Sequence, residues 1–147
     1  MSFSVNEINK IFGFENSRNF NNKEYTFKRI SIDSRNISNN DLFIAIQGNR
    51  FDGHDFIQEV IKKGVKGLII SNDKRHLIPD NYTYWAVPDT KEAFQKLALF
   101  KRRNLNIPVV AITGSVGKTT TKEITGSILK DFGKIKISAK NNNNEIG

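Results

Sequence analysis

Hydrophobic and polar residues are distributed along this chain in two patterns, which predict two kinds of element. Apolar residues three or four positions apart, behind an acidic or hydroxyl residue that can cap a first turn, predict helices. Short apolar runs bounded by polar turns predict strands. The predicted helices follow Ser4, Asp55 and Asp89, and the predicted strands cover residues 25–32, 42–46, 67–70 and 82–87. Because these helices and strands alternate, we expect an α/β fold with a parallel sheet.

Glycines and apolar stripes define the predicted helices more closely. Gly13 is expected to end the first helix and Gly64 the second, and the third runs through Arg103. The predicted inward faces are Phe56, Val60 and Ile61 in the second helix, and Phe94, Leu97 and Ala98 with the stem of Lys101 in the third.

A junction at residues 104–108 precedes a second α/β unit. A strand is predicted at 109–112, a helix near 118–131 and another strand at 135–138. A single strand–helix–strand unit leaves a bare sheet edge and little surface to bury its helix. We therefore expect this chain to be the front of a longer protein.

The segment 111–121, Ala-Ile-Thr-Gly-Ser-Val-Gly-Lys-Thr-Thr-Thr, has the layout of a phosphate-binding loop between a strand and a helix. Gly114 and Gly117 allow the backbone N–H groups to turn toward an anion, and Lys118 adds a mobile positive charge. The hydroxyl of Thr119 suits the Mg²⁺ that accompanies a triphosphate. The general pattern has its first glycine where this chain has Ile112, so the loop is shorter than in GTPases and common kinases.

Composition narrows the classes of partner. Lys and Arg outnumber Asp and Glu by 23 to 15, a net charge of +8 that favours anionic partners such as nucleotides and phosphosugars. The basic residues are spread out and no RNA-reading aromatic motif is present, so no nucleic-acid partner is expected. The chain has no cysteine, which excludes disulfides and thiolate metal sites. Without a secretory signal or an apolar run of about 20 residues, it is expected to be a cytoplasmic protein with no membrane span.

Three segments together resemble the ATP-dependent Mur ligases of bacterial cell-wall synthesis. The first is Ile-Asp-Ser-Arg at 32–35 with the segment 41–54, the second is the loop at 113–123, and the third is Asn-Asn-Asn-Asn-Glu-Ile-Gly at 141–147. Within the family, the last segment is similar to the type that adds D-Ala-D-Ala to UDP-N-acetylmuramoyl-tripeptide.

The resemblance implies two domains and their sites. Residues 1–105, including a connecting helix at 90–103, would bind the UDP-muramoyl peptide, and 106–147 would be the truncated start of an ATP-binding central domain. The implied substrate contacts are Ser34, Arg35, Asn49, Arg50, Phe51, Asp52, Gly53, His54, Asn141 and Asn144. The implied ATP contacts are Gly114, Ser115, Val116, Gly117, Lys118, Thr119 and Thr120, with Lys118 and Thr119 as catalytic residues and Thr119 as the Mg²⁺ ligand.

The implied reaction is a ligation, in which ATP phosphorylates the tripeptide carboxylate and the amine of D-Ala-D-Ala attacks the acyl phosphate. The full-length protein is expected to be a monomer, and this portion to be inactive alone. From residue types alone, 33–34 and 52–53 could be simple turns, and the asparagine run a polar tail. Two other functions stay open: another phosphate-loop enzyme (a small-molecule kinase or GTPase), and a non-enzymatic module that binds UDP-sugars or RNA.

Overall fold

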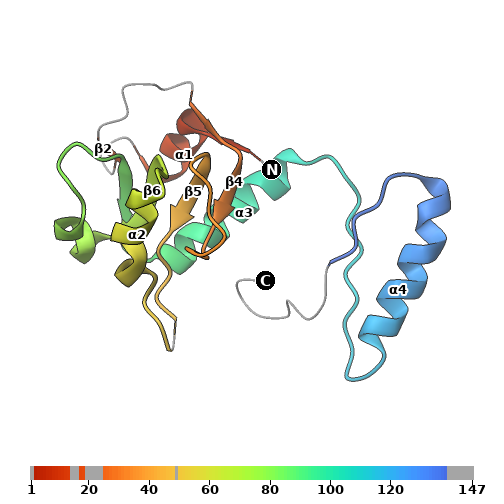
Figure 1. Ribbon diagram of the computed structural model, residues 1–147. Helices are drawn as coiled ribbons and strands as arrows, with labels where there is room; N and C mark the ends of the chain where they lie inside the picture. Colours follow the sequence, from red (N-terminus) through yellow and green to blue (C-terminus); the bar gives the residue numbers. More distant parts are fainter. Residues whose placement is uncertain (1, 14–16, 19–24, 49, 139–147) are drawn as a thin grey trace. The chain divides into compact units, whose positions relative to one another are not determined.

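The computed structural model describes residues 2–13, 17–18, 25–48 and 50–138 (Figure 1). The chain divides into two compact units, residues 1–104 and residues 105–147. Within the described residues, no helix has the length and apolar character that a membrane crossing requires.

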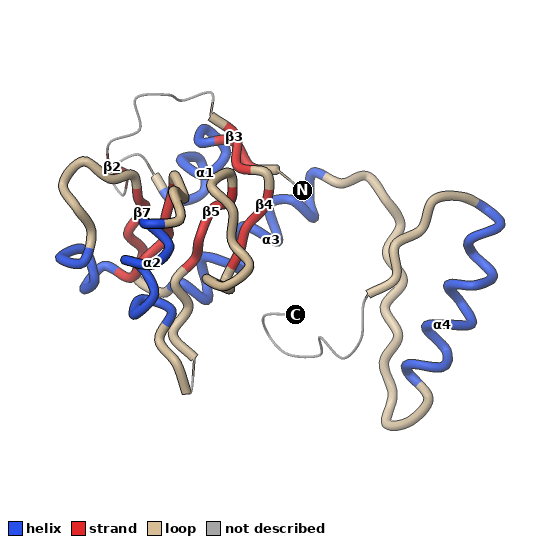
Figure 2. The backbone as a smooth tube through the Cα atoms, viewed as in Figure 1, coloured by secondary structure: helices blue, strands red, loops and turns tan. Residues whose placement is uncertain are grey.

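The first unit is built on a five-stranded sheet with the strand order β2-β7-β6-β5-β4 (Figure 2). Four of its strands are parallel: β4 (Arg29–Ser31), β5 (Asp41–Ile44), β6 (Gly67–Ser71) and β7 (Tyr84–Val87). The short strand β2 (Ser17–Arg18) pairs antiparallel with β7. Because parallel strands share one direction, the segments that follow β4, β5, β6 and β7 all leave from the same edge of the sheet.

Helices cover both faces of this sheet, and the strand side chains alternate between them. One face packs against α1 (Val5–Phe12) and α3 (Thr90–Asn104), and the other against α2 (Ile57–Lys62). The first face carries Leu42, Ile44, Ile69, Trp85 and Val87, and the second carries Phe43, Ala45, Leu68, Ile70, Tyr84 and Ala86. The predicted α/β class with a parallel sheet is therefore confirmed.

The predicted strand over residues 25–32 is divided between two sheets. Strand β3 (Thr26–Phe27) pairs antiparallel with β1 (Phe3–Ser4), whereas β4 joins the main sheet. The fully buried ring of Phe27 packs on β6 at Gly67, where an added Cβ would lie 2.5 Å from the ring. The glycine therefore makes room for the aromatic ring.

Two predicted helix starts and one predicted end are confirmed. Ser4 and Glu7 form the capping box of α1, since each side chain accepts a hydrogen bond from the other residue's backbone N–H. At the end of α1, Gly13 has a φ of 85°. Asp89 caps α3 by accepting the backbone N–H groups of Lys91 and Glu92 at 2.7 and 3.0 Å.

The predicted start of the second helix is wrong. A 3₁₀ turn, η2 (Gly53–Phe56), precedes α2, and the carboxylate of Asp52 caps it by accepting the N–H of His54 at 2.9 Å. The chain thus becomes helical before Asp55, which removes the predicted capping role of that residue. Phe56 is also turned outward, and Ile57 takes its place in the core.

The inward face of α3 differs from the prediction by one position. Leu97 is buried as predicted, but Ala98 is exposed and Ala93 is buried instead. Lys101 extends along the protein, with its Nζ 4.4 Å from the centre of the Phe3 ring and 2.6 Å from Oε1 of Glu7.

The second unit contains one α-helix within its described residues, α4 (Lys118–Leu129), followed by the 3₁₀ turn η4 (Lys130–Phe132). The predicted strands at 109–112 and 135–138 are not formed. A strand requires a hydrogen-bonded neighbour, and the described part of this unit provides none. The segment 135–138 instead packs on α4, where a Cβ added at Gly126 would collide with the side chain of Ile137. The apolar side chains of Ile124, Ile128 and Leu129 on α4 are exposed.

Candidate functional site

The two predicted substrate segments of the first unit lie on neighbouring strands. Residues 32–36 follow β4 and residues 45–54 follow β5, and these strands pair in parallel with Ser31 opposite Phe43. In open α/β sheets, ligands bind outside the carboxyl ends of the strands. The fold therefore brings both segments to the edge where a ligand is expected.

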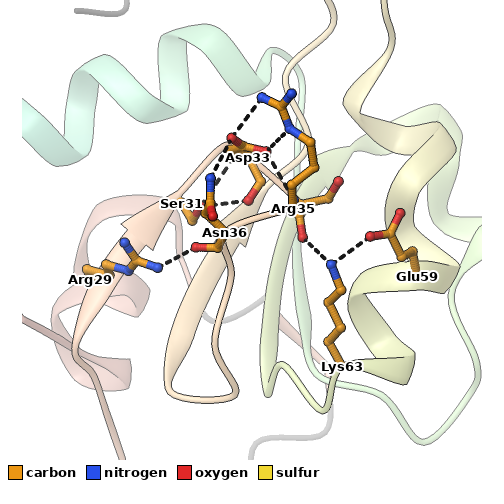
Figure 3. A network of polar contacts seen from close by, with 8 residues as sticks. Arg29, Ser31, Asp33, Arg35, Asn36, Glu59 and Lys63 are labelled. Atoms are coloured by element: carbon orange, nitrogen blue, oxygen red, sulfur yellow. Dashed lines mark hydrogen bonds and ion pairs between the residues drawn. The ribbon is translucent and has the colours of Figure 1, made fainter.

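The loop after β4 presents an oriented guanidinium group (Figure 3). The carboxylate of Asp33 accepts hydrogen bonds from Nε and Nη2 of Arg35 at 2.9 and 3.0 Å, and from the Arg35 backbone N–H at 3.0 Å. The side chain of Arg35 is nevertheless 83% exposed. Such a two-point pair fixes the plane of the guanidinium while leaving it accessible to an anion.

The ion pair between Asp33 and Arg35 should be detectable in the titration of the Asp33 carboxyl group. Hydrogen bonds from Arg35 lower the pKa of Asp33 from 3.8 to about 2. Because this pKa is lowered, any stabilisation by the pair is complete above pH 3.8 and is lost as the pH falls toward 2. We expect NMR titration of the Asp33 carboxyl to give a midpoint near 2, and R35M to return it toward 3.8. An unchanged midpoint in R35M would contradict the pair.

Two cations hold the backbone of the same loop. Nζ of Lys63, the C-cap residue that follows α2, donates to the carbonyl oxygen of Ser34 at 2.8 Å and pairs with Glu59 at 2.7 Å (Figure 3). Arg29 donates to the carbonyl oxygen of Asn36. Ser34 itself is buried.

Neither cation could be recognised from the sequence as a part of this loop. Lys63 is one of 23 basic residues in the chain, and the carbonyl oxygen that it binds, on Ser34, is 29 positions away in the sequence. No local pattern marks such a pair.

The loop after β5 folds back on itself and exposes its tip. The N–H of Gly53 donates to the carbonyl oxygen of Ile46, and that of Gly48 to the carbonyl oxygen of Phe51, both at 2.9 Å. A Cβ added at Gly53 would lie 2.7 Å from the backbone nitrogen of Ile46, so only glycine fits. Arg50 is exposed and Phe51 is 74% exposed, whereas Asn49 lies outside the described residues. The tip thus offers a cation and an aromatic ring.

The end of this loop is held by a buried histidine. The His54 side chain is 2% exposed, its Nδ1 lies 2.5 Å from Oδ1 of Asp52, and its Nε2 accepts the backbone N–H of Ser71 at 3.0 Å. Burial raises the pKa of Asp52, but hydrogen bonds from the backbone and the ring of His54, together with the charge of Lys74, outweigh burial, so the pKa is lowered overall. Asp52 is therefore held as a carboxylate.

The glycine-rich loop of the second unit leads directly into α4. Gly117 precedes the helix with a φ of 79°, and Gly114 has a φ of 152°. The backbone N–H of Thr121 donates to the carbonyl oxygen of Gly117, which leaves the amides of 118–120 without intrahelical acceptors. In the described structure, no side chain caps this helix start. These amides are suited to bind an anion.

The remaining predicted nucleotide contacts surround that helix start. Nζ of Lys118 donates to the carbonyl oxygen of Gly114, so the lysine lies over the loop. Ser115, Val116, Thr119 and Thr120 are exposed, Val116 at 89%. A phosphate would find amides, one cation and hydroxyl groups on a single short segment, which fits the predicted ligand. Asn141 and Asn144 lie outside the described residues.

The profile of the Mur ligase family, catalytic domain, matches residues 26–102. The chain belongs to the Mur ligase family. The matched residues lie within the first unit and do not include the glycine-rich loop.

Individual relatives extend the similarity over the whole chain. The UDP-N-acetylmuramoyl-tripeptide–D-alanyl-D-alanine ligase of Rickettsia prowazekii is 40% identical over 152 aligned positions, covering all of this chain and 31% of the relative. The enzyme of the same name from Synechocystis is 36% identical over 125 residues, covering 85% of this chain and 27% of the relative. The chain thus spans about 30% of the length of these relatives.

Solved structures agree with the fold. A crystal structure of MurF from Acinetobacter baumannii matches 99% of this chain and 31% of that protein, with a TM-score of 0.85 and 31% identity. The MurF ligase of Thermotoga maritima in complex with ADP matches 70% of this chain and 23% of that protein, with a TM-score of 0.62 and 38% identity.

Proposed function

We propose that this chain is the N-terminal part of an ATP-dependent ligase that adds D-Ala-D-Ala to UDP-N-acetylmuramoyl-tripeptide. The observation that carries the proposal is the similarity, over the full chain, to ligases of that name. In this proposal residues 1–105 bind the UDP-muramoyl peptide, and 106–147 begin the ATP-binding domain. The ligation itself requires the rest of the longer protein.

The exposed groups at the carboxyl edge of the sheet suit the UDP end of the substrate. The guanidinium of Arg35, oriented by Asp33, can pair with a pyrophosphate through two hydrogen bonds. Arg50 adds a second exposed cation, and the ring of Phe51 offers a flat surface to the uracil base. Ser34, Asp52, Gly53 and His54 shape the two loops that carry these groups.

The glycine-rich loop suits the phosphates of ATP. The amides from Gly114 to Thr120 orient donors toward the triphosphate, and Lys118 offsets the negative charge that develops when the terminal phosphoryl group is transferred. Thr119 supplies a hydroxyl ligand for Mg²⁺. The acceptor of the phosphoryl group is the terminal carboxylate of the tripeptide, and the amine of D-Ala-D-Ala then displaces the phosphate.

Binding of UDP tests the substrate half of the proposal. We expect calorimetric titration of the 147-residue chain with UDP to show saturable binding, and R35A to weaken it about tenfold, because a charge-assisted contact is lost. Arg103, which is exposed on α3, gives the matched control R103A, whose affinity should equal that of the wild type. Retention of RNA at low salt without any binding of UDP would instead support the non-enzymatic module.

A further inference from the structure

The residue His54 joins the segments that follow two neighbouring strands. Its own turn follows β5, and its Nε2 accepts the backbone N–H of Ser71, the last residue of β6. Its backbone N–H and its Nδ1 both point to the same oxygen of Asp52, at 2.9 and 2.5 Å. One buried ring therefore links the end of the exposed loop 47–53 to the sheet.

The hydrogen bonds determine which ring nitrogen carries the proton. A backbone N–H can only donate, so Nε2 of His54 acts as the acceptor and is unprotonated. The proton is then on Nδ1, which donates it to the carboxylate of Asp52. Both nitrogens are used within the protein, and the side chain is 2% exposed. No polar atom of the ring is left for a ligand.

We propose that His54 is a positioning residue of the substrate site, which acts by fixing the loop that carries Arg50 and Phe51 and does not touch the substrate. The inference rests on the proposed function, because it assigns a ligand-binding role to that loop tip. Loss of the histidine would leave Gly53 in place but would release the loop from β6.

The first test uses the wild-type chain and needs no substitution. In a long-range ¹H–¹⁵N NMR spectrum, His54 should show the Nδ1–H tautomer at neutral pH, both alone and saturated with UDP. A change of tautomer, or a ligand contact to the ring, on addition of UDP would overturn the positioning role. His76, which is exposed and has its Nδ1 3.0 Å from the carbonyl oxygen of Asp73, serves as the internal reference for a solvent-exposed ring.

The second test uses two variants that each keep one half of the linkage. In H54N, the side-chain amide can still donate a hydrogen bond to the carboxylate of Asp52 but is too short to accept the backbone N–H of Ser71. In H54Q, the longer side chain can accept the N–H of Ser71 but no longer makes the hydrogen bond to Asp52. We expect H54N to weaken UDP binding about fivefold and to speed amide hydrogen exchange at Gly48 and Gly53 about tenfold, since one hydrogen bond is lost. The core amides of β5 and β6 should keep their exchange rates. H76N is the matched control and should change neither quantity.

The affinity for UDP and the amide exchange rates of the loop together show whether His54 positions the loop, contacts the ligand or has no part in the site. Weaker UDP binding with unchanged loop exchange would mean that His54 contacts the ligand, which would overturn the inference. Faster loop exchange with unchanged affinity would also overturn it, because the loop would then not belong to the site. If the wild-type chain does not bind UDP, the proposed function itself fails and the positioning role falls with it. If both variants unfold, the tautomer measurement on the wild type decides.

Discussion

Replacing Lys118 with alanine is expected to reduce the rate of ATP-dependent ligation by at least about a hundredfold in the full-length protein that contains this segment. The lysine is the cation that lies over the glycine-rich loop, with its Nζ on the carbonyl oxygen of Gly114. Removal of one oriented group that stabilises transition-state charge costs about 10²–10³ in rate in other enzymes. Release of ADP, followed by a coupled assay, gives the rate.

A control and a second measurement make this result specific. Lys130 stands at the other end of α4, and K130A should retain the wild-type rate. The affinity of K118A for UDP should also be unchanged, because the substitution lies in the second unit. Wild-type turnover in K118A would contradict the assignment of the loop to ATP.

Replacing Trp85 with phenylalanine is expected to lower the free energy of unfolding by about 2–4 kcal/mol. The indole is fully buried, and its Nε1 donates to Oδ1 of Asn9 on α1 at 2.7 Å. Phenylalanine leaves a small cavity and removes the donor of a buried amide oxygen. Urea denaturation of the chain followed by circular dichroism measures the change.

A second substitution separates the two causes. Adding N9L to W85F removes the unsatisfied amide, so the double variant should recover part of the lost stability. Exposed Phe51 gives the control F51L, which should stay within about 0.5 kcal/mol of the wild type. Equal stability of W85F and the wild type would contradict the importance of this hydrogen bond.

Most of the first unit could be predicted from local pattern. The capping residues Ser4 and Asp89 and the apolar strands each carry their signal within a few positions. The start of α2 could not be predicted correctly, because Asp52 and Asp55 are both good caps. The choice between them depends on the hydrogen bond of Gly53 to Ile46, which only the folded loop provides.

In the second unit, local sequence pattern predicts the helix correctly but not the strands. Residues 109–112 have the composition of a strand, yet strand geometry depends on a neighbour, and the described residues of this unit contain no other strand. The helix α4 forms where predicted because its hydrogen bonds are internal.

The candidate sites could be predicted only as segments. The motifs marked residues 34–35, 49–54 and 114–120 as candidates, but not the contacts that hold these loops. Lys63, Arg29 and Ser71 act through partners distant in sequence. The family resemblance implied that His54 contacts the substrate, whereas its burial and its two protein partners became visible only in the fold.

Helix α2 is attached to both candidate substrate loops. The 3₁₀ turn that precedes it contains His54, which follows the loop after β5. Its C-cap residue, Lys63, donates to the carbonyl oxygen of Ser34 in the loop after β4. Both candidate loops are therefore attached to the same short helix. If both loops contact the substrate as proposed, a displacement of either loop on binding would tilt this helix or break one of its two attachments, which would couple the two loops.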